Sequence, residues 1–142
     1  MINRVIVDTG PLVALLNARE THHAVVRETL DAIEPPLSTC EAVITETCFL
    51  VRQLAGGADA VFDLISRGIV RVDFRLSSEI EPVRKLMAKY ASVPMSLADA
   101  CLVRMTELHA RSSVLTLDGD FGVYRRNGRH VVPLIPLTSR TG

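Results

Sequence analysis

The sequence has no tryptophan, few other aromatic residues, no net charge and no long apolar run. Aromatic residues make up 4% of its 142 residues, so the chain has few rings on which an unpaired nucleobase could stack. Sixteen basic residues balance sixteen acidic ones, which excludes a bulk attraction to phosphate polymers or anionic membranes. The apolar segment 131–137 contains prolines and is far shorter than the roughly 18 residues of a membrane span. We therefore expect a soluble protein without a membrane partner, and any contact with nucleic acid must be local.

Cysteine is also scarce. Cys40, Cys48 and Cys101 are odd in number, have no C-x-x-C spacing and lie in apolar stretches, as is typical of reduced thiols in a core. The sequence passes from Met1 directly into the apolar segment Arg4–Val7, so no secretion signal is predicted. Both observations favour a cytoplasmic location.

The length suits one domain, which we expect over residues 1–137, with 138–142 as a flexible tail. Short apolar segments alternate regularly with segments of helical periodicity. Strands are predicted at 4–7, 37–38, 69–74, 113–116 and 130–135. Helices are predicted from residue 10 and at about 21–33, 40–54, 58–66, 78–91 and 97–110. This alternation predicts an α/β fold, in which a parallel sheet is covered by helices on both faces.

Acidic residues follow two of the predicted strands. Asp8 comes directly after the first strand, and Asp118 lies two residues beyond the strand that ends at Thr116. In parallel α/β sheets, ligands bind beyond the carboxyl ends of the strands. Structural explanations also exist, because Asp8 could cap the following helix and Asp118 could shape an Asp-Gly turn.

Two more acidic residues lie on predicted helices. Glu41 is explained by a capping box with Ser38, whereas Glu46 lies in the apolar stripe of the same helix. An ionised carboxylate is costly there unless a cation pairs with it, although a helix-edge Glu46 could reach solvent. Asp99 follows Ser96 by three residues, which also fits a helix cap.

The predicted topology brings these four carboxylates toward one crevice. Without a counter-ion, their mutual repulsion would raise their pKa values and cost stability. A hard divalent cation such as Mg²⁺ or Mn²⁺ removes this repulsion, keeps several water ligands and commonly binds substrate phosphate. The sequence therefore predicts a site where a metal activates water for phosphodiester cleavage.

At these residues the chain resembles the PIN-domain ribonucleases, especially the VapC-like toxins of bacterial toxin–antitoxin pairs. The resemblance extends from Val5 to about Ile135 and rests on four segments in order: Val7–Leu12, Ile44–Glu46, Ser96–Ala100 and Thr116–Phe121. It implies a Rossmann-like fold with a five-stranded parallel sheet. It also implies Mg²⁺- or Mn²⁺-dependent endonucleolytic cleavage of RNA by metal-activated water, leaving a 3′-hydroxyl and a 5′-phosphate.

The resemblance further implies roles for individual residues. Four carboxylates would form the catalytic, metal-binding set: Asp8, Glu46, Asp99 and Asp118. Asp120 would be a further metal-binding or supporting residue, and Thr9 and Thr116 would orient carboxylates or water. Toxins of this kind are homodimers, silenced by a small antitoxin whose C-terminal segment covers the site. The chain departs from the family pattern at Gly119, where a larger side chain is expected, and this leaves open whether Asp118 or Asp120 is the principal ligand.

Basic residues near the acidic loop are candidates for RNA binding, namely Arg125 and Arg126, with Arg104 on the preceding helix. A solvated basic surface is the alternative. Two other functions are weighed. A small-molecule phosphohydrolase would need an Asp nucleophile and a second Asp two residues later, where this chain has Gly10. A non-catalytic RNA-binding or protein-interaction domain would not need all four carboxylates, so the intact set favours the nuclease.

Overall fold

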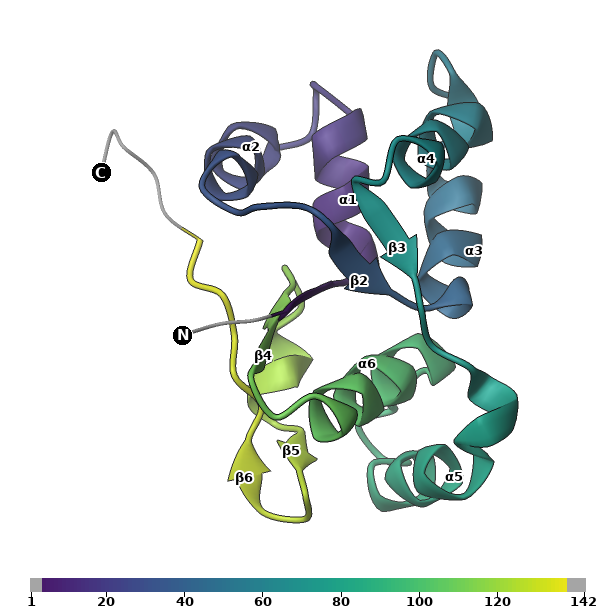
Figure 1. Cartoon of the computed structure of the whole chain (residues 1–142), viewed down its shortest axis with the longest axis vertical. Coiled ribbons are helices and arrows are strands. Elements are labelled where there is room, and N and C mark those ends of the chain that lie inside the picture. The colour runs from purple at the N-terminus through teal and green to yellow at the C-terminus, as the bar shows by residue number, and fades with distance from the viewer. Residues whose placement is uncertain (1–3, 138–142) are drawn as a thin grey trace.

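Four short apolar segments form the central sheet of the computed structural model, which describes residues 4–137. The strands are β1 (Arg4–Val7), β2 (Leu37–Thr39), β3 (Val70–Val72) and β4 (Ser112–Leu115). They are all parallel and lie in the order β3-β2-β1-β4 (Figure 1). The predicted α/β class is confirmed. The predicted tail at 138–142 lies outside the described residues.

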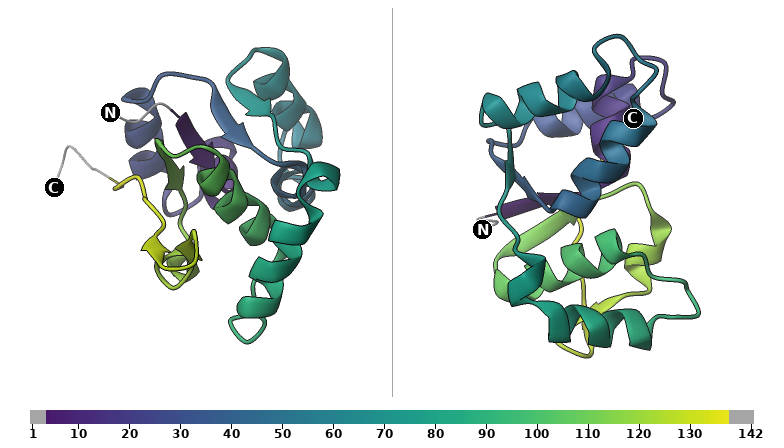
Figure 2. Two further views of the ribbon diagram at one scale, coloured as in Figure 1. Left: turned by 60° about the horizontal axis from the view of Figure 1, so that its bottom comes forward. Right: turned by 90° about the vertical axis from the view of Figure 1, so that its right-hand side faces the viewer.

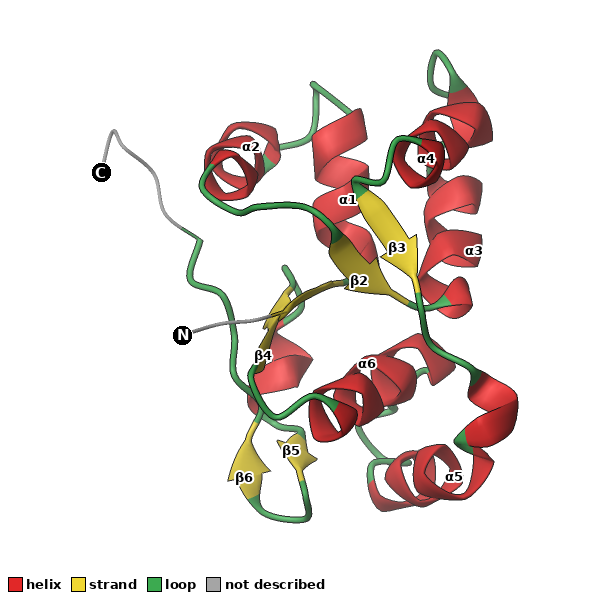
Figure 3. Cartoon of the chain, in the orientation of Figure 1, coloured by secondary structure: helices red, strands yellow, loops and turns green. Residues whose placement is uncertain are grey.

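Helices cover both faces of this sheet. The longer ones are α1 (Thr9–Leu16), α2 (His23–Asp31), α3 (Glu41–Leu50), α4 (Gly57–Ser66), α5 (Ile80–Lys89) and α6 (Leu97–Leu108), and a 3₁₀ helix, η1 (Leu76–Ser78), precedes α5. The strands lie between α1–α4 on one side and α5 and α6 on the other (Figures 2 and 3). No helix in the range 4–137 is both long and apolar enough to cross a bilayer.

The core lies between β1 and α6. β1 buries Val5, Ile6 and Val7, while α6 buries residues on all sides because it packs against α3, α5, β1 and β4. Each large apolar side chain buried in this way stabilises the fold by roughly 1.5–3 kcal/mol. The residues that follow β1 and those that begin α6 are therefore held by the best-packed part of the molecule.

The predicted strand at 130–135 is mostly replaced by a hairpin. β5 (Arg125–Arg126) and β6 (His130–Val131) pair antiparallel. Beyond them the chain pairs with β4 only through a single parallel bridge between Leu134 and Val114. Pro133 and Pro136 flank this bridge, and proline has no N–H with which to extend a ladder. The parallel sheet within residues 4–137 therefore has four strands, not the five that the resemblance implied.

The first residues of α3 and α6 can be compared with the helix caps that the sequence predicts. The capping box of Ser38 and Glu41 was wrong, because the N-cap of α3 is Cys40 and Ser38 lies inside β2, where its hydroxyl donates to Asp73 at 3.3 Å. The Ser96 cap is confirmed, because its Oγ accepts the Asp99 N–H at 3.0 Å. This cap fixes the first turn of α6.

Candidate active site

The carboxyl ends of β1 and β4 form a topological switch point. The chain passes from β1 to β2 on one side, whereas β4 lies on the other side of β1. Asp8 follows β1, and its N–H donates to the carbonyl oxygen of Leu115 in β4 at 3.0 Å. Such points are where open parallel sheets bind ligands.

A cavity of about 520 Å³ opens at this point. It is lined by all five of the acidic residues predicted from the sequence: Asp8, Glu46, Asp99, Asp118 and Asp120. They come from four separate parts of the chain. The predicted convergence on one crevice is therefore present in the structure.

Asp8 is buried, with 7% of its surface exposed. Its Oδ1 accepts the Thr9 N–H at 2.7 Å, and its Oδ2 accepts the Thr116 hydroxyl at 2.7 Å. Burial raises the pKa of Asp8 to about 6, although both hydrogen bonds oppose the rise, and the charges of Asp99 and Asp118 add to it. An ionised Asp8 is thus held in place by its donors but lacks a compensating cation.

Asp99 is held by a buried tyrosine. The Tyr124 hydroxyl donates to Asp99 Oδ2 at 2.7 Å, and the Tyr124 ring is fully buried, edge-on to Tyr90 and Phe121. Burial raises the pKa of Asp99, the bond from Tyr124 opposes this, and Asp118 adds to it. Sequence reasoning missed this contact: the spacing of Phe121 and Tyr124 indicates apolar packing, but it does not identify the partner of the hydroxyl.

Glu46 reaches the cavity from an exposed position, so its predicted burial was wrong. The buried residues of α3 are Val43 and Thr47, whereas Phe49 is 60% and Leu50 49% exposed. The apolar side chains near the end of α3 therefore face outward, because periodicity separates two faces of a helix without telling which one the fold covers. Oε2 of Glu46 accepts the Thr9 hydroxyl at 3.2 Å.

The loop after β4 is shaped by its own side chains. The Asp118 N–H donates to Thr116 Oγ1 at 3.0 Å, and Asp118 Oδ1 accepts the Asp120 N–H at 2.9 Å. Asp118 therefore caps the 3₁₀ helix η2 (Gly119–Gly122). Thr116 bonds to both Asp8 and the Asp118 backbone, so it joins the two strand-end carboxylates.

Comparison with known proteins identifies the family. The model of the PIN domain family matches residues 5–127. The chain belongs to the PIN domain family. Ribonuclease VapC26 of Mycobacterium tuberculosis (strain ATCC 25618 / H37Rv) is 30% identical over 126 residues, which cover 80% of this chain and 85% of that protein. The predicted resemblance to VapC-like PIN ribonucleases is thereby confirmed.

A solved structure supports the same fold. The crystal structure of Mycobacterium tuberculosis VapC20, a sarcin-ricin loop cleaving toxin, matches with a TM-score of 0.75 and 23% identity. The match covers 84% of this chain and 93% of that one. At this level of identity, the likeness shows that the two PIN domains share a fold.

Glu20 and Gly10 are among the residues of the PIN-domain cavity that were not predicted as site residues. Glu20, in the loop between α1 and α2, adds a sixth carboxylate to the lining, and that loop has no periodicity from which its position could be inferred. Gly10 also lines the cavity, and a Cβ added to it would lie only 3.3 Å from Cβ of Leu117. The missing side chain thus allows the start of α1 to approach the loop after β4.

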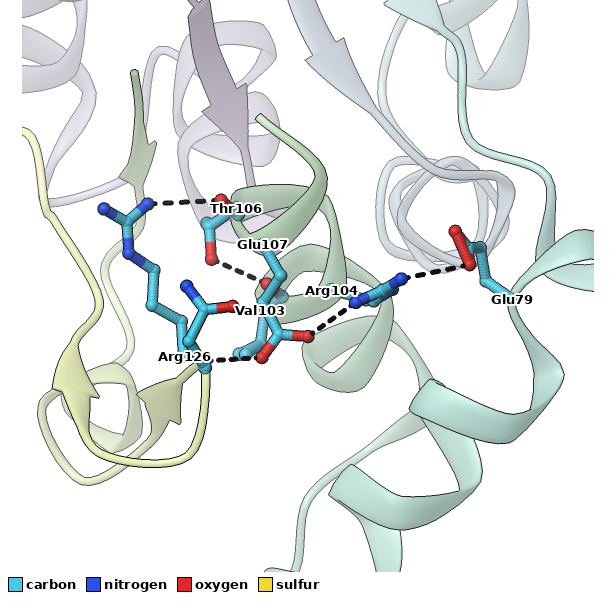
Figure 4. A network of polar contacts seen from close by, with 7 residues as sticks. Glu79, Val103, Arg104, Thr106, Glu107 and Arg126 are labelled. Carbon is cyan, nitrogen blue, oxygen red and sulfur yellow. Dashed lines mark hydrogen bonds and ion pairs between the residues drawn. The ribbon is translucent and has the colours of Figure 1, made fainter. Parts of the chain in front are cut away.

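None of the three predicted RNA-binding arginines lines the carboxylate cavity. Among residues 4–137, no Lys, Arg or His lines the carboxylate cavity. The guanidinium groups of Arg104 and Arg126 contact other parts of the chain (Figure 4), and so does that of Arg125. Their partners are the carboxylates of Glu79 and Glu107 and the carbonyl oxygens of Thr106, Ala110, Gly122, Val123 and Tyr124. The geometry does not support these arginines as contacts to a phosphate held in this cavity.

The donor chemistry of the cavity fits a hard divalent cation. Among residues 4–137, the ionisable side chains that line it are all carboxylates, and burial raises the pKa values of Asp8 and Asp99 with no basic side chain of the lining to oppose the rise. Across residues 4–137, no group of three or more His, Cys, Asp or Glu side chains is placed so that it could hold a metal ion by itself. Mg²⁺ is commonly held by one or two carboxylates, water and substrate phosphate, so an open arrangement suits this ion.

Proposed function

We propose that this PIN domain is a metal-dependent endoribonuclease that hydrolyses phosphodiester bonds of RNA and acts as the toxin of a toxin–antitoxin pair. The observation that carries the proposal is the convergence of Asp8, Glu46, Asp99 and Asp118 on one cavity at the switch point. The similarity to the ribonuclease VapC26 supports RNA as the substrate.

The chain's own residues position and charge this site. Thr9 and Thr116 orient Glu46 and Asp8 through the hydrogen bonds described above, and Tyr124 does the same for Asp99. Bound Mg²⁺ or Mn²⁺ would activate water and neutralise developing charge on the phosphate. Asp8, Asp99, Asp118 and Glu46 would hold the ion, with Asp120 in support.

The exposed apolar surface of α3 and α4 supports the proposed protein partners, a cognate antitoxin and a second copy of the chain. Phe49 and Leu50 of α3 and Phe62 of α4 are 60%, 49% and 52% exposed, and the two helices pack together. Leu50 also lines the carboxylate cavity, so a segment bound to this surface would approach the active site. Free thiols at Cys40, Cys48 and Cys101 favour action in the reducing cytoplasm.

The decisive test is cleavage of RNA by purified protein with Mg²⁺ or Mn²⁺. We expect products with a 3′-hydroxyl and a 5′-phosphate, and no cleavage in EDTA. Asp8→Asn and Glu46→Gln should each abolish cleavage while circular dichroism shows an intact fold. Glu41→Gln is the matched control, because Glu41 is exposed on the same helix as Glu46 but does not line the cavity. Cleavage that survives both substitutions would refute the proposal.

A further inference from the structure

A second cavity, of about 490 Å³, adjoins the carboxylate cavity. Leu117 and Asp118 line both cavities. The other walls of the second cavity come from the loop at Gly119, from His22 and from the segment Leu134–Leu137. A ligand that spans the two cavities would pass directly over Asp118.

The walls of the second cavity combine apolar side chains with hydrogen-bonding groups. Leu134 and Leu137 are 43% and 36% exposed although they are large and apolar. His22, Thr116 and Asp118 add polar atoms. A nucleobase has apolar faces and a hydrogen-bonding edge, so it matches this combination. The volume lies within the range of about 300–1,000 Å³ typical of small-molecule sites.

Among residues 4–137, His22 is the only Lys, Arg or His side chain on the walls of either cavity. Its Nδ1 lies 3.6 Å from Oε1 of Glu20, and Glu20 lines the carboxylate cavity. The pair therefore spans the boundary between the two cavities. A polynucleotide that extends from the carboxylates into the second cavity would pass the imidazole of His22, whose ring nitrogens can form hydrogen bonds.

Gly119 leaves the second cavity open. No heavy atom lies within 4 Å of a Cβ built on Gly119, and its φ is outside the left-handed region. The backbone therefore does not require glycine here, and a larger side chain would project into free space at the cavity wall. Gly122, in the same 3₁₀ helix, has the same two properties but lines neither cavity.

We propose that the second cavity binds the nucleobase adjacent to the scissile phosphate. This rests on the proposed function, because a phosphate at the carboxylates places the neighbouring nucleoside at the adjoining cavity. A base inside an A-form duplex is stacked and paired, so it cannot enter.

The test combines a protein variant with a bulky side chain at the second cavity and an RNA substrate that lacks one base. Gly119→Phe places a large side chain at the wall of the second cavity, and Gly122→Phe is the matched control. Circular dichroism and Mn²⁺ titration of both variants check that the fold and the metal site persist. The cleavage site is mapped with the wild-type protein and Mn²⁺ on an unstructured oligoribonucleotide. Each base that flanks this site is then removed in turn by an abasic substitution, and kcat/KM is measured on every substrate.

We expect removal of one flanking base to lower wild-type kcat/KM by about 5- to 10-fold, the lower end of the range for base stacking. Gly119→Phe should show a similar loss on the intact RNA and no further loss on the abasic RNA. Gly122→Phe should match the wild type on both. Pairing the cleavage site with a complementary strand should suppress cleavage by all three proteins.

Three results would overturn the inference while leaving the nuclease proposal intact. The first is wild-type activity of Gly119→Phe on intact RNA. The second is a Gly119→Phe variant as sensitive to base removal as the wild type, which would indicate another occupant, such as a segment of a protein partner. The third is efficient cleavage within a duplex. If Gly119→Phe does not fold, Leu134→Ser is tested in its place, because Leu134 also lines the second cavity. It should likewise lower kcat/KM on the intact RNA and show no further loss on the abasic RNA. Absence of any wild-type cleavage would instead refute the proposed function.

Discussion

Replacing Asp8 with asparagine should stabilise the metal-free protein increasingly as the pH rises. Asparagine has nearly the same shape as aspartate but cannot ionise. In the folded protein the pKa of Asp8 is raised from 3.8 to about 6, chiefly by burial. A raised carboxyl pKa means that the folded state binds the proton more tightly than the unfolded state. The resulting stabilisation is complete below pH 3.8 and is lost as the pH rises through about 6.

The expected magnitude follows from these two pKa values. The difference between 3.8 and about 6 corresponds to about 3 kcal/mol of unfolding free energy when the group is fully ionised. Between pH 4.5 and 7.5, the wild type should lose about 2 kcal/mol through Asp8. Asp8→Asn has no such loss. The unfolding free energy of the variant minus that of the wild type should therefore rise by about 2 kcal/mol over this interval.

Urea denaturation in EDTA, followed by circular dichroism at pH 4.5 and 7.5, measures this difference. The substitution also changes the hydrogen bonds to Thr9 and Thr116. This change affects the unfolding free energy of the variant nearly equally at both pH values, so it largely cancels when the two values are compared. Asp31→Asn is the control, because Asp31 is exposed in the last turn of α2 and lines neither cavity. Its difference from the wild type should stay constant with pH.

A difference between Asp8→Asn and wild type that does not change with pH would contradict the raised pKa. Mn²⁺ provides the converse measurement at pH 7.5. At 100 times its dissociation constant, the ion should stabilise the wild type by about 2.7 kcal/mol. It should stabilise Asp8→Asn much less, because one of the carboxylates that hold it is gone.

Three further predictions concern residues around the cavity. Tyr124→Phe removes the hydroxyl that donates to Asp99 but keeps the buried ring, so calorimetry should show about 10-fold weaker Mn²⁺ binding in an intact fold. Thr116→Val removes a hydrogen bond that lowers the pKa of Asp8, so ¹³C NMR titration of the metal-free protein should show a higher pKa, restored by Thr116→Ser. Arg126→Ala removes hydrogen bonds to Thr106 and Ala110 and should destabilise the fold by about 1–3 kcal/mol with unchanged RNA cleavage. Cleavage that falls without a loss of stability would instead support RNA binding by Arg126.

The sequence predicted the strand-end part of the site well because local signals determine it. Apolar segments define β1 and β4. Asp8 follows β1 directly and Asp118 lies in the loop after β4, so a parallel sheet brings the two residues together. The Ser96 cap of α6 was equally local, because capping depends on residues three positions apart.

Features that depend on how elements pack could not be predicted in the same way. The sequence gives α3 two faces, but only the packed structure shows that the face of Phe49 and Leu50 is exposed. The contact between Tyr124 and Asp99 joins residues 25 positions apart. A fifth strand was wrongly predicted at 130–135 because the segment is rich in apolar and β-branched residues. Pro133 interrupts it, and only a single bridge to β4 forms.

Stability and proposed activity place opposite demands on the same carboxylates. The burial that raises the pKa of Asp8 costs stability in the metal-free protein at neutral pH, yet it also keeps Asp8 fixed by the Thr9 and Thr116 donors. The surrounding core of β1 and α6 is well packed, so it can hold this unfavourable charge without local rearrangement. A divalent cation would gain affinity from the same unfavourable charge, because binding relieves the repulsion among Asp8, Asp99 and Asp118. In the proposed nuclease, the electrostatic cost of the acidic cavity in the metal-free protein would therefore contribute to its affinity for the ion.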